Sequence, residues 1–173
     1  TLCKIFSDNL EISSLTSIKK GISTGENERF IRFFYEVSFN NFSLYEINFD
    51  KKWFPLNKGG DFRKYYGNIN SVINWKNDGK ELNDLKPKSV IRSRNNFFRK
   101  NISFNKISSS NFSLRLFEEG FISLDSSSYF IDYKPQYELY FLGPLNSKIF
   151  NLLLGKLVPT LNFEIGDISK FPI

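Results

Sequence analysis

The chain has 173 residues, of which 40% are hydrophobic and 17% aromatic, and its formal net charge is +6. This length suits one domain with one core, and this composition excludes the disordered class. With no histidine and only Cys3, the chain excludes an internal disulfide, the common zinc sites and histidine-dependent nucleophiles. We therefore expect a single domain spanning residues 1–173, located in the reducing cytoplasm.

Two further features of the composition set expectations about the parent protein. No run of about 18 apolar residues occurs, so we expect no membrane span and no membrane partner. The chain contains no methionine, starts at Thr1 and ends on apolar residues. We therefore expect an excised piece of a longer protein.

Positive charge is concentrated in the middle third of the chain. Residues 50–106 contain 14 Lys or Arg and 5 Asp or Glu. Clustered cations are the electrostatic footprint of a nucleic-acid partner, so we expect a basic face there. An acidic protein partner is the alternative explanation of the same charge.

The N-terminal quarter predicts a β-hairpin. Residues 15–22 and 29–37 are extended in pattern, and the second run is rich in β-favouring Phe, Ile, Tyr and Val. Between them, Ser23-Thr24-Gly25-Glu26-Asn27 has the composition of a turn. Residues 40–48 suit either a short helix or a short strand.

Residues 53–75 combine cations, glycines and aromatic rings. The stretch contains Lys58, Arg63, Lys64, the Gly59-Gly60 pair, and the adjacent Tyr65 and Tyr66. Cations suit a phosphate backbone, rings suit stacked bases, and glycines allow backbone N–H groups to approach an anion. A solvated surface loop is the alternative, and Trp53 and Trp75 suit packing better than base contact.

The pattern after this stretch alternates between strand and helix. Residues 70–75 predict a strand, Asn77-Asp78-Gly79 a turn, and residues 80–85 the start of a helix. Residues 88–100 place apolar positions at helical spacing beside four cations, which predicts an amphipathic helix. The cationic side of that helix carries Arg92, Arg94, Arg99 and Lys100.

The C-terminal half predicts strands followed by helices. Residues 102–107, 111–117 and 120–131 alternate in polarity, with a hairpin turn at 118–120. Residues 137–145 and 146–158 predict helices separated by Gly143-Pro144, and 160–168 is extended. The whole pattern predicts an α+β fold in which helices pack on a twisted, mainly antiparallel sheet.

Catalytic chemistry is sparse in this sequence. Only carboxylates, Lys and Tyr remain for acid–base work, and no P-loop spacing occurs around Gly59-Gly60. The Pro-Pro-aromatic core of amino-methyltransferases is also missing. We expect no enzyme activity from this chain alone, with a carboxylate enzyme that uses Asp125 or Glu118 as the alternative.

Five blocks, in a fixed order, carry a resemblance to a known family. They are KGISTGENERFIRFFYEV (20–37), KWFPLNKGGDFRKYYGN (52–68), VINWKNDGKEL (72–82), ISSSNFSLRLFEEGFISLDSSSYFI (107–131) and LGPLNSKIFNLLLGKLVPTLNFEIGDISKFPI (142–173). Together they resemble the target recognition region of adenine-specific DNA methyltransferases of the BREX phage-defence type (PglX-like) and of related type II restriction–modification enzymes. Residues 124–128 replace the glycines that this family usually has, so we expect a different local turn there.

The resemblance implies a role in reading double-stranded DNA. In that family an N-terminal methyl-transfer domain of the same chain holds S-adenosylmethionine and methylates adenine, so this piece itself should bind no cofactor and no metal. A protein-interaction domain of the defence complex is the alternative. The candidate DNA-contacting residues, from composition and resemblance together, are Thr24, Asn27, Lys58, Gly59, Gly60, Arg63, Lys64, Tyr66, Asn77, Arg92, Arg94, Arg99, Lys100, Ser109 and Arg115.

Overall fold

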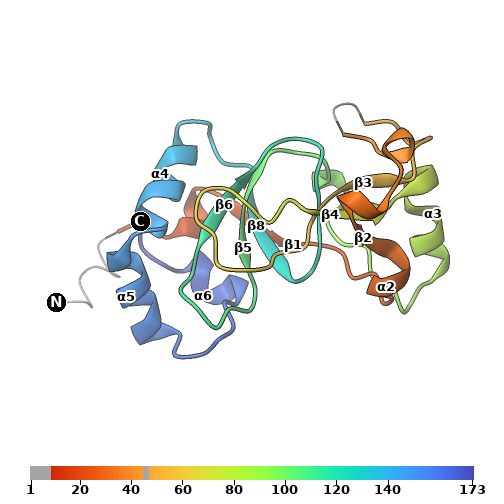
Figure 1. The fold of residues 1–173 in the computed structure, drawn as a ribbon. Helices are drawn as coiled ribbons and strands as arrows, with labels where there is room; N and C mark the ends of the chain where they lie inside the picture. The colour runs from red at the N-terminus through yellow and green to blue at the C-terminus, as the bar shows by residue number, and fades with distance from the viewer. Residues whose placement is uncertain (1–8, 45–46) are drawn as a thin grey trace.

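The computed structural model describes residues 9–44 and 47–173, and its strands form two four-stranded sheets (Figure 1). The first sheet has the order β1-β8-β5-β6, and all of its neighbouring strands are antiparallel. Its strands are β1 (Ser17–Lys20), β5 (Asn101–Asn105), β6 (Leu114–Phe117) and β8 (Ser127–Ile131). The α+β class and the mainly antiparallel pairing predicted from the sequence are confirmed.

The second sheet has the order β2-β4-β3-β7. Its strands are β2 (Ile31–Phe33), β3 (Trp53–Asn57), β4 (Ser71–Asn74) and β7 (Ile122–Ser123). The β3–β7 pair is parallel, whereas β2–β4 and β3–β4 are antiparallel. The strands expected in one sheet are thus divided between two.

Helices cover one face of the first sheet. Because side chains alternate along a strand, Ile102, Phe104 and Leu114 point to the same face and are buried there with Phe141 and Phe150. The covering helices are α4 (Tyr137–Leu145), α5 (Lys148–Leu157) and α6 (Ile165–Ser169), with the short η1 (Ile12–Ser14) beside them. Figure 1 shows α4, α5 and α6 gathered at one end of the molecule.

The second sheet has its own core around Trp75. This ring is fully buried with Phe54 and Ile73, and its indole N–H donates to Asp78 Oδ1 at 3.1 Å. Gly79 has a φ of +72°, and a Cβ there would lie 2.8 Å from the indole ring. The expected packing role of Trp75 is confirmed.

Short helical segments flank the second sheet. These are α2 (Asn27–Phe30), η2 (Phe34–Glu36), η3 (Phe39–Asn41), α3 (Lys76–Asp84) and η4 (Arg94–Asn96). Within α3, residues 77–79 have left-handed dihedral angles, so the predicted turn precedes the regular helix. Residues 40–48 contain the end of η3, and positions 45–46 lie outside the described residues.

The N-terminal hairpin prediction is wrong. β1 pairs with β8 and β2 pairs with β4, so the two runs belong to different sheets. The chain turns away at Ser23, whose N–H and C=O pair with the backbone of Val90 at 2.9 and 2.8 Å. Within residues 29–37, only Ile31–Phe33 is a strand.

The predicted amphipathic helix over residues 88–100 is also wrong. Only η4 is helical there, because Ser93 and Phe98 adopt left-handed conformations with φ of 54° and 64°. Phe97 packs into the core of the second sheet from an irregular segment and not from one face of a helix. The apolar spacing that predicted a helix therefore arises from separate contacts of an irregular segment.

Three smaller predictions in the C-terminal half also need correction. The hairpin at 118–120 is wrong, because β6 pairs with β5 while β7 pairs with β3. The predicted break at Gly143-Pro144 lies inside α4, which continues to Leu145. Residues 160–168 form one isolated bridge, Asn162 with Ile107, before α6 begins.

Candidate nucleic-acid interface

The loop of residues 58–70 joins two strands of the second sheet but is attached to the first. Tyr65 N donates to Leu114 O at 2.8 Å, and Leu116 N donates to Tyr65 O at 2.9 Å. Tyr65 thus extends the edge of the first sheet beside β6 (bridge to Arg115). Figure 1 shows the loop, in yellow, passing across the strands of that sheet. Both ends and the middle of the loop are therefore fixed to sheet backbone.

Hydrogen bonds hold the glycine pair at the start of the loop. Gly59 N donates to Asn57 Oδ1 at 3.3 Å, and Gly60 O accepts from Asn105 Nδ2 at 2.5 Å. Gly59 has a φ of +81°, and a Cβ there would lie 3.1 Å from both Asn105 Oδ1 and Ser127 Oγ. This conformation and close approach require glycine. The Gly59 N–H is directed inward to Asn57 and is not presented to a ligand.

A buried polar network lies beneath these glycines, on the face of the first sheet opposite the helices. Asn57 Nδ2 donates to Ser103 Oγ at 2.7 Å, which joins β3 to β5. Ser127 Oγ donates to Asn57 Oδ1 at 3.2 Å. These contacts connect the two sheets through side chains that are all buried.

Arg115 is the charged member of this network. Its side chain is fully buried, and Nη2 donates to Asn105 Oδ1 at 2.6 Å. Its Nε and Nη1 atoms have no hydrogen-bond partner among the described residues. Burial lowers the pKa of Arg115 to about 10, so the guanidinium is still charged at neutral pH. Alternation correctly placed Arg115 opposite Leu114, yet the structure makes it a support for Asn105 and Gly60 rather than an exposed group.

The outer side of the loop presents cations and rings. Lys58 and Arg63 are exposed, and Tyr65 and Tyr66 have exposed fractions of 54% and 67%. Lys64 differs, because it is half-buried and its Nζ donates to the backbone carbonyl of Asn146. The loop therefore offers Lys58, Arg63 and Tyr66 to a ligand, while Lys64 attaches it to the helices.

Asn146, which accepts the hydrogen bond from Lys64, lies between α4 and α5 and also contacts β6. Its side chain accepts from Leu114 N at 2.8 Å and donates to Leu114 O at 3.0 Å. The predicted helix boundary at this residue thus contacts the strand edge on which Tyr65 also pairs.

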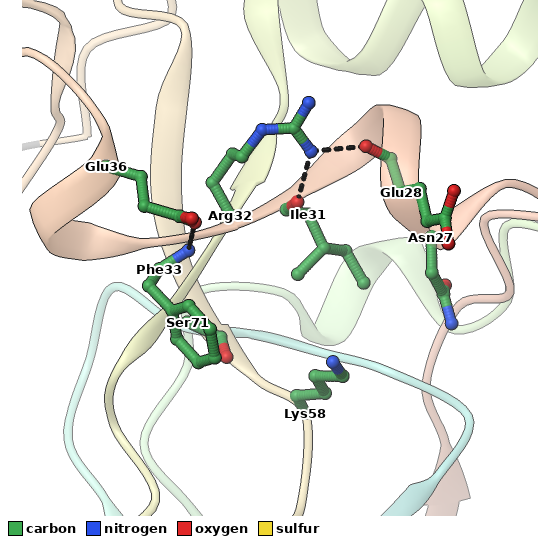
Figure 2. A pocket seen from close by; sticks show the side chains of 8 residues that line it. All are labelled: Asn27, Glu28, Ile31, Arg32, Phe33, Glu36, Lys58 and Ser71. Carbon is green, nitrogen blue, oxygen red and sulfur yellow. Dashed lines mark hydrogen bonds between the residues drawn. The ribbon is translucent and has the colours of Figure 1, made fainter.

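A hollow of about 330 Å³ lies beside Lys58 and is lined by residues of two of the predicted blocks. Figure 2 shows the side chains that line it. Asn27, the first residue of α2, lines it across from Lys58, and Thr24 Oγ1 donates to Asn27 Oδ1 at 2.5 Å. Thr24 itself is buried, so it positions Asn27. The full lining is Asn27, Glu28, Ile31, Arg32, Phe33, Glu36, Lys58 and Ser71.

Arg32 of this hollow was not predicted from the sequence. Its Nη1 donates to Ile31 O at 2.7 Å and also to Glu28 O (Figure 2). Glu36 accepts from Phe33 N at 2.7 Å. In the sequence, Arg32 was visible only as a cation five positions after Asn27, in a run that was predicted to be a strand of a hairpin.

Three predicted cations outside the loop form ion pairs. Arg94 pairs with Asp78 at 2.5 Å, and Arg99 pairs with Asp132 at 2.8 Å. Lys100 contacts Glu138 at 3.1 Å and Glu118 at 3.4 Å, and the hydrogen bond to Glu138 raises the pKa of Lys100.

The remaining predicted residues are exposed. Asn77 and Ser109 lie on the surface, and so does Arg92. Within the described ranges, Arg92 has no ion pair. They join the loop cations as side chains that are open to a ligand.

Two other kinds of site are absent from residues 9–44 and 47–173. No group of three or more His, Cys, Asp or Glu side chains is placed to hold a metal ion. In the same residues, no helix has the length and apolar character needed to cross a membrane.

Comparison with known proteins finds two relatives that are both adenine-specific methyltransferases. No family model matches the sequence. The chain is 40% identical over 174 residues to the adenine-specific methyltransferase PglX of Lacticaseibacillus casei (strain Zhang), covering 94% of this chain and 14% of that protein. It is 36% identical over 161 residues to the adenine-specific methyltransferase BrxX of Escherichia coli O9:H4 (strain HS), covering 91% of this chain and 13% of that protein. Nearly all of this chain is therefore similar to a segment that makes up a small part of two adenine-specific methyltransferases.

Proposed function

We propose that this chain is the double-stranded DNA recognition module of an N6-adenine DNA methyltransferase in a phage-defence system. The observation that carries the proposal is the loop of residues 58–70, whose backbone is fixed between two sheets while Lys58, Arg63 and Tyr66 face outward. Similarity along nearly the whole chain to PglX and BrxX supports the same role.

The loop and the adjacent hollow divide the work of DNA binding. Lys58 and Arg63 contact phosphates, which fixes the position of the duplex and makes the affinity dependent on salt. Asn27, across the hollow from Lys58, has the amide that suits bidentate contact with adenine. Tyr66 offers a ring face for stacking.

Methylation itself belongs to another part of the same polypeptide in this proposal. That part would bind S-adenosylmethionine, extrude the target adenine and transfer the methyl group. This chain would hold the duplex in register for that step. The short share of the relatives that it covers, 13 to 14%, leaves ample length for such a domain.

Exposed apolar side chains on the helices favour a second candidate, a protein-interaction surface. Leu139 on α4 has an exposed fraction of 78%, and Ile149 and Leu152 on α5 have 71% and 66%. Exposed apolar side chains on two helices that contact each other suit packing against another domain. This role requires no DNA and would be indifferent to its sequence.

Selection from a pool of random duplexes at two salt concentrations tests the proposal. The chain should retain duplexes that share a short sequence, with affinity that falls as salt rises. A Lys58→Ala/Arg63→Ala variant should retain much less DNA of every sequence. Retention without enrichment would leave a nonspecific clamp, and no retention at low salt would contradict DNA recognition and favour the protein-interaction surface.

A further inference from the structure

A larger hollow, of about 590 Å³, borders the same loop. One part of its wall consists of aromatic rings, Phe34 and Phe39 from η2 and η3 and the nearby Phe42. Phe34 and Phe39 have exposed fractions of 51% and 70%. The rings of Phe39 and Phe42 are nearly perpendicular, at 88° with centroids 6.3 Å apart. The hollow thus offers an open ring face with a second ring supporting it at the edge.

The polar side chains of the lining, Asp61, Arg63, Asn68 and Asn70, come from the loop itself, and Leu44, Pro55, Ile69 and Phe121 complete an otherwise apolar wall. Arg63 Nη1 donates a hydrogen bond to the backbone carbonyl of Phe62 at 3.1 Å, and the other N–H donors of its guanidinium group are left for a ligand. Asp61 contributes a carboxylate, and Asn68 donates to the Asp61 carbonyl at 2.8 Å, which fixes this side of the hollow. Within the described residues, Asp61 and Arg63 form no ion pair with each other.

This lining discriminates between classes of ligand. A carboxylate repels phosphate, so the hollow is not a second phosphate site. A flat, neutral group with both donors and acceptors along its edge satisfies Asp61 and Arg63 together, and its face suits the exposed ring of Phe39. A nucleobase has this combination of properties, and the hollow is large enough to take one.

We infer that this hollow receives one unpaired nucleobase of the bound DNA, stacked on Phe39 with its edge toward Asp61 and Arg63. The inference rests on the proposed function, because Arg63 belongs to the same loop that contacts the duplex, and its five N–H donors allow it to contact a phosphate outside the hollow and the edge of the base together. It adds a site for a base outside the helix to a surface that otherwise contacts backbone and groove. No covalent bond changes in this step.

Paired and bulged duplexes that contain 2-aminopurine, a fluorescent adenine analogue, test the inference. The two duplexes differ only in whether the analogue is paired or is a single-base bulge. The chain should bind the bulged duplex about tenfold more tightly, which corresponds to one stacked base, and should quench its fluorescence. Phe39→Ala should abolish both the preference and the quenching.

Matched variants separate stacking from general DNA binding. Tyr35→Ala removes a ring of similar exposure, 68%, that does not line the hollow, and it should leave the preference intact. Lys58→Ala should weaken binding of both duplexes by the same factor. Because Phe39 and Tyr35 are largely exposed, neither change removes a core side chain.

The possible outcomes have different consequences for the two proposals. Salt-dependent binding with equal affinity for the two duplexes would overturn the base site and leave the DNA role standing. If Phe39→Ala still prefers the bulged duplex, the base site is also overturned. The exposed rings would then suit a contact with a protein. If neither duplex binds at low salt, the DNA role fails and the base site fails with it.

Discussion

Two stretches of this chain, residues 58–70 and residues 88–100, are both basic, and their cations have different surroundings. In the first, Lys58 and Arg63 have no ion pair among the described residues. In the second, Arg94 and Arg99 each contact an Asp, and Lys100 contacts two Glu. The comparison teaches that a charge counted in a sequence is available to a polyanion only when the fold has not already paired it. Four changes test or sharpen this difference.

The largest effect should come from removing the unpaired cations. Lys58→Ala/Arg63→Ala should weaken duplex binding by about 10- to 100-fold and reduce the salt dependence by roughly two units of slope, because each phosphate contact contributes about 0.9. Arg94→Ala/Arg99→Ala should weaken binding by less than about threefold, because those guanidinium groups are already paired. Fluorescence anisotropy at four salt concentrations measures both slopes. Equal losses in the two variants would contradict the comparison.

Next in size is a change to the backbone that carries the unpaired cations. Gly59→Ala should lower the free energy of unfolding by about 1 to 2 kcal/mol, because φ at this residue is +81°. DNA affinity should fall further than the loss of folded protein explains, since Lys58 follows the displaced backbone.

Gly155→Ala is the matched control for this change. Gly155 lies inside α5, and a Cβ added there would meet no other part of the protein within 4 Å, so alanine should stabilise the chain by about 0.5 to 1 kcal/mol. Urea unfolding followed by circular dichroism measures both variants. Equal destabilisation of the two would contradict the left-handed requirement at Gly59.

A smaller effect, opposite in sign, should follow from freeing a paired cation. Asp132→Asn removes the partner of Arg99, and asparagine tolerates the φ of 63° at this position. Duplex affinity should rise about two- to threefold, because the freed guanidinium gains access to phosphate. Asp167→Asn on α6 makes the same change in net charge away from Arg99, and a rise of equal size there would show a general charge effect instead.

The smallest effect concerns the ion pair that joins the turn before α2 to the second basic stretch. The hydrogen bond from Lys88, with a contribution from Arg29, lowers the pKa of Glu26 below 4.5. Because the folded pKa lies below the unfolded one, this contribution to stability is fully present above the unfolded pKa and is lost as pH falls through the folded pKa. Glu26→Gln should therefore be slightly less stable than the parent at pH 7, and the difference should shrink as the pH is lowered into the acid range, measured by urea unfolding. A deficit that stays constant across the acid range would contradict an electrostatic origin.

Local pattern in the sequence was sufficient to place most strands. Alternation located β5, β6 and β8, and the turn residues in the first turn of α3 were recognised, because both signals depend on neighbours along the chain. Pairing was not predictable in the same way. β1 joins β8, more than 100 residues away, and no local turn signal along the chain reports this pairing.

The candidate site shows the same division. The glycine block was recognisable because cations, rings and Gly59-Gly60 are adjacent in sequence. The pairing of Arg99 with Asp132 and the burial of Arg115 depend on residues that only folding brings close, so composition gave no sign of either. The hollow that Asn27 and Lys58 both line also depends on the second sheet, because its strand order β2-β4-β3 brings the segment that follows α2 into the same sheet as the strand that precedes Lys58.

If the proposed function holds, the order of the strands has a consequence for how a DNA preference would be exchanged between related chains. Going along the sequence, β1 lies in the first sheet, β2 to β4 in the second, β5 and β6 in the first, β7 in the second and β8 in the first. A recombination point in the middle of the chain would therefore separate partners in both sheets at once. We expect a new DNA preference to arise either by exchange of the whole chain or by substitutions that are confined to the loop of residues 58–70. In that loop, Lys58, Arg63 and Tyr66 face outward while the backbone is fixed at both ends and in the middle, so these positions can diverge without re-pairing a strand.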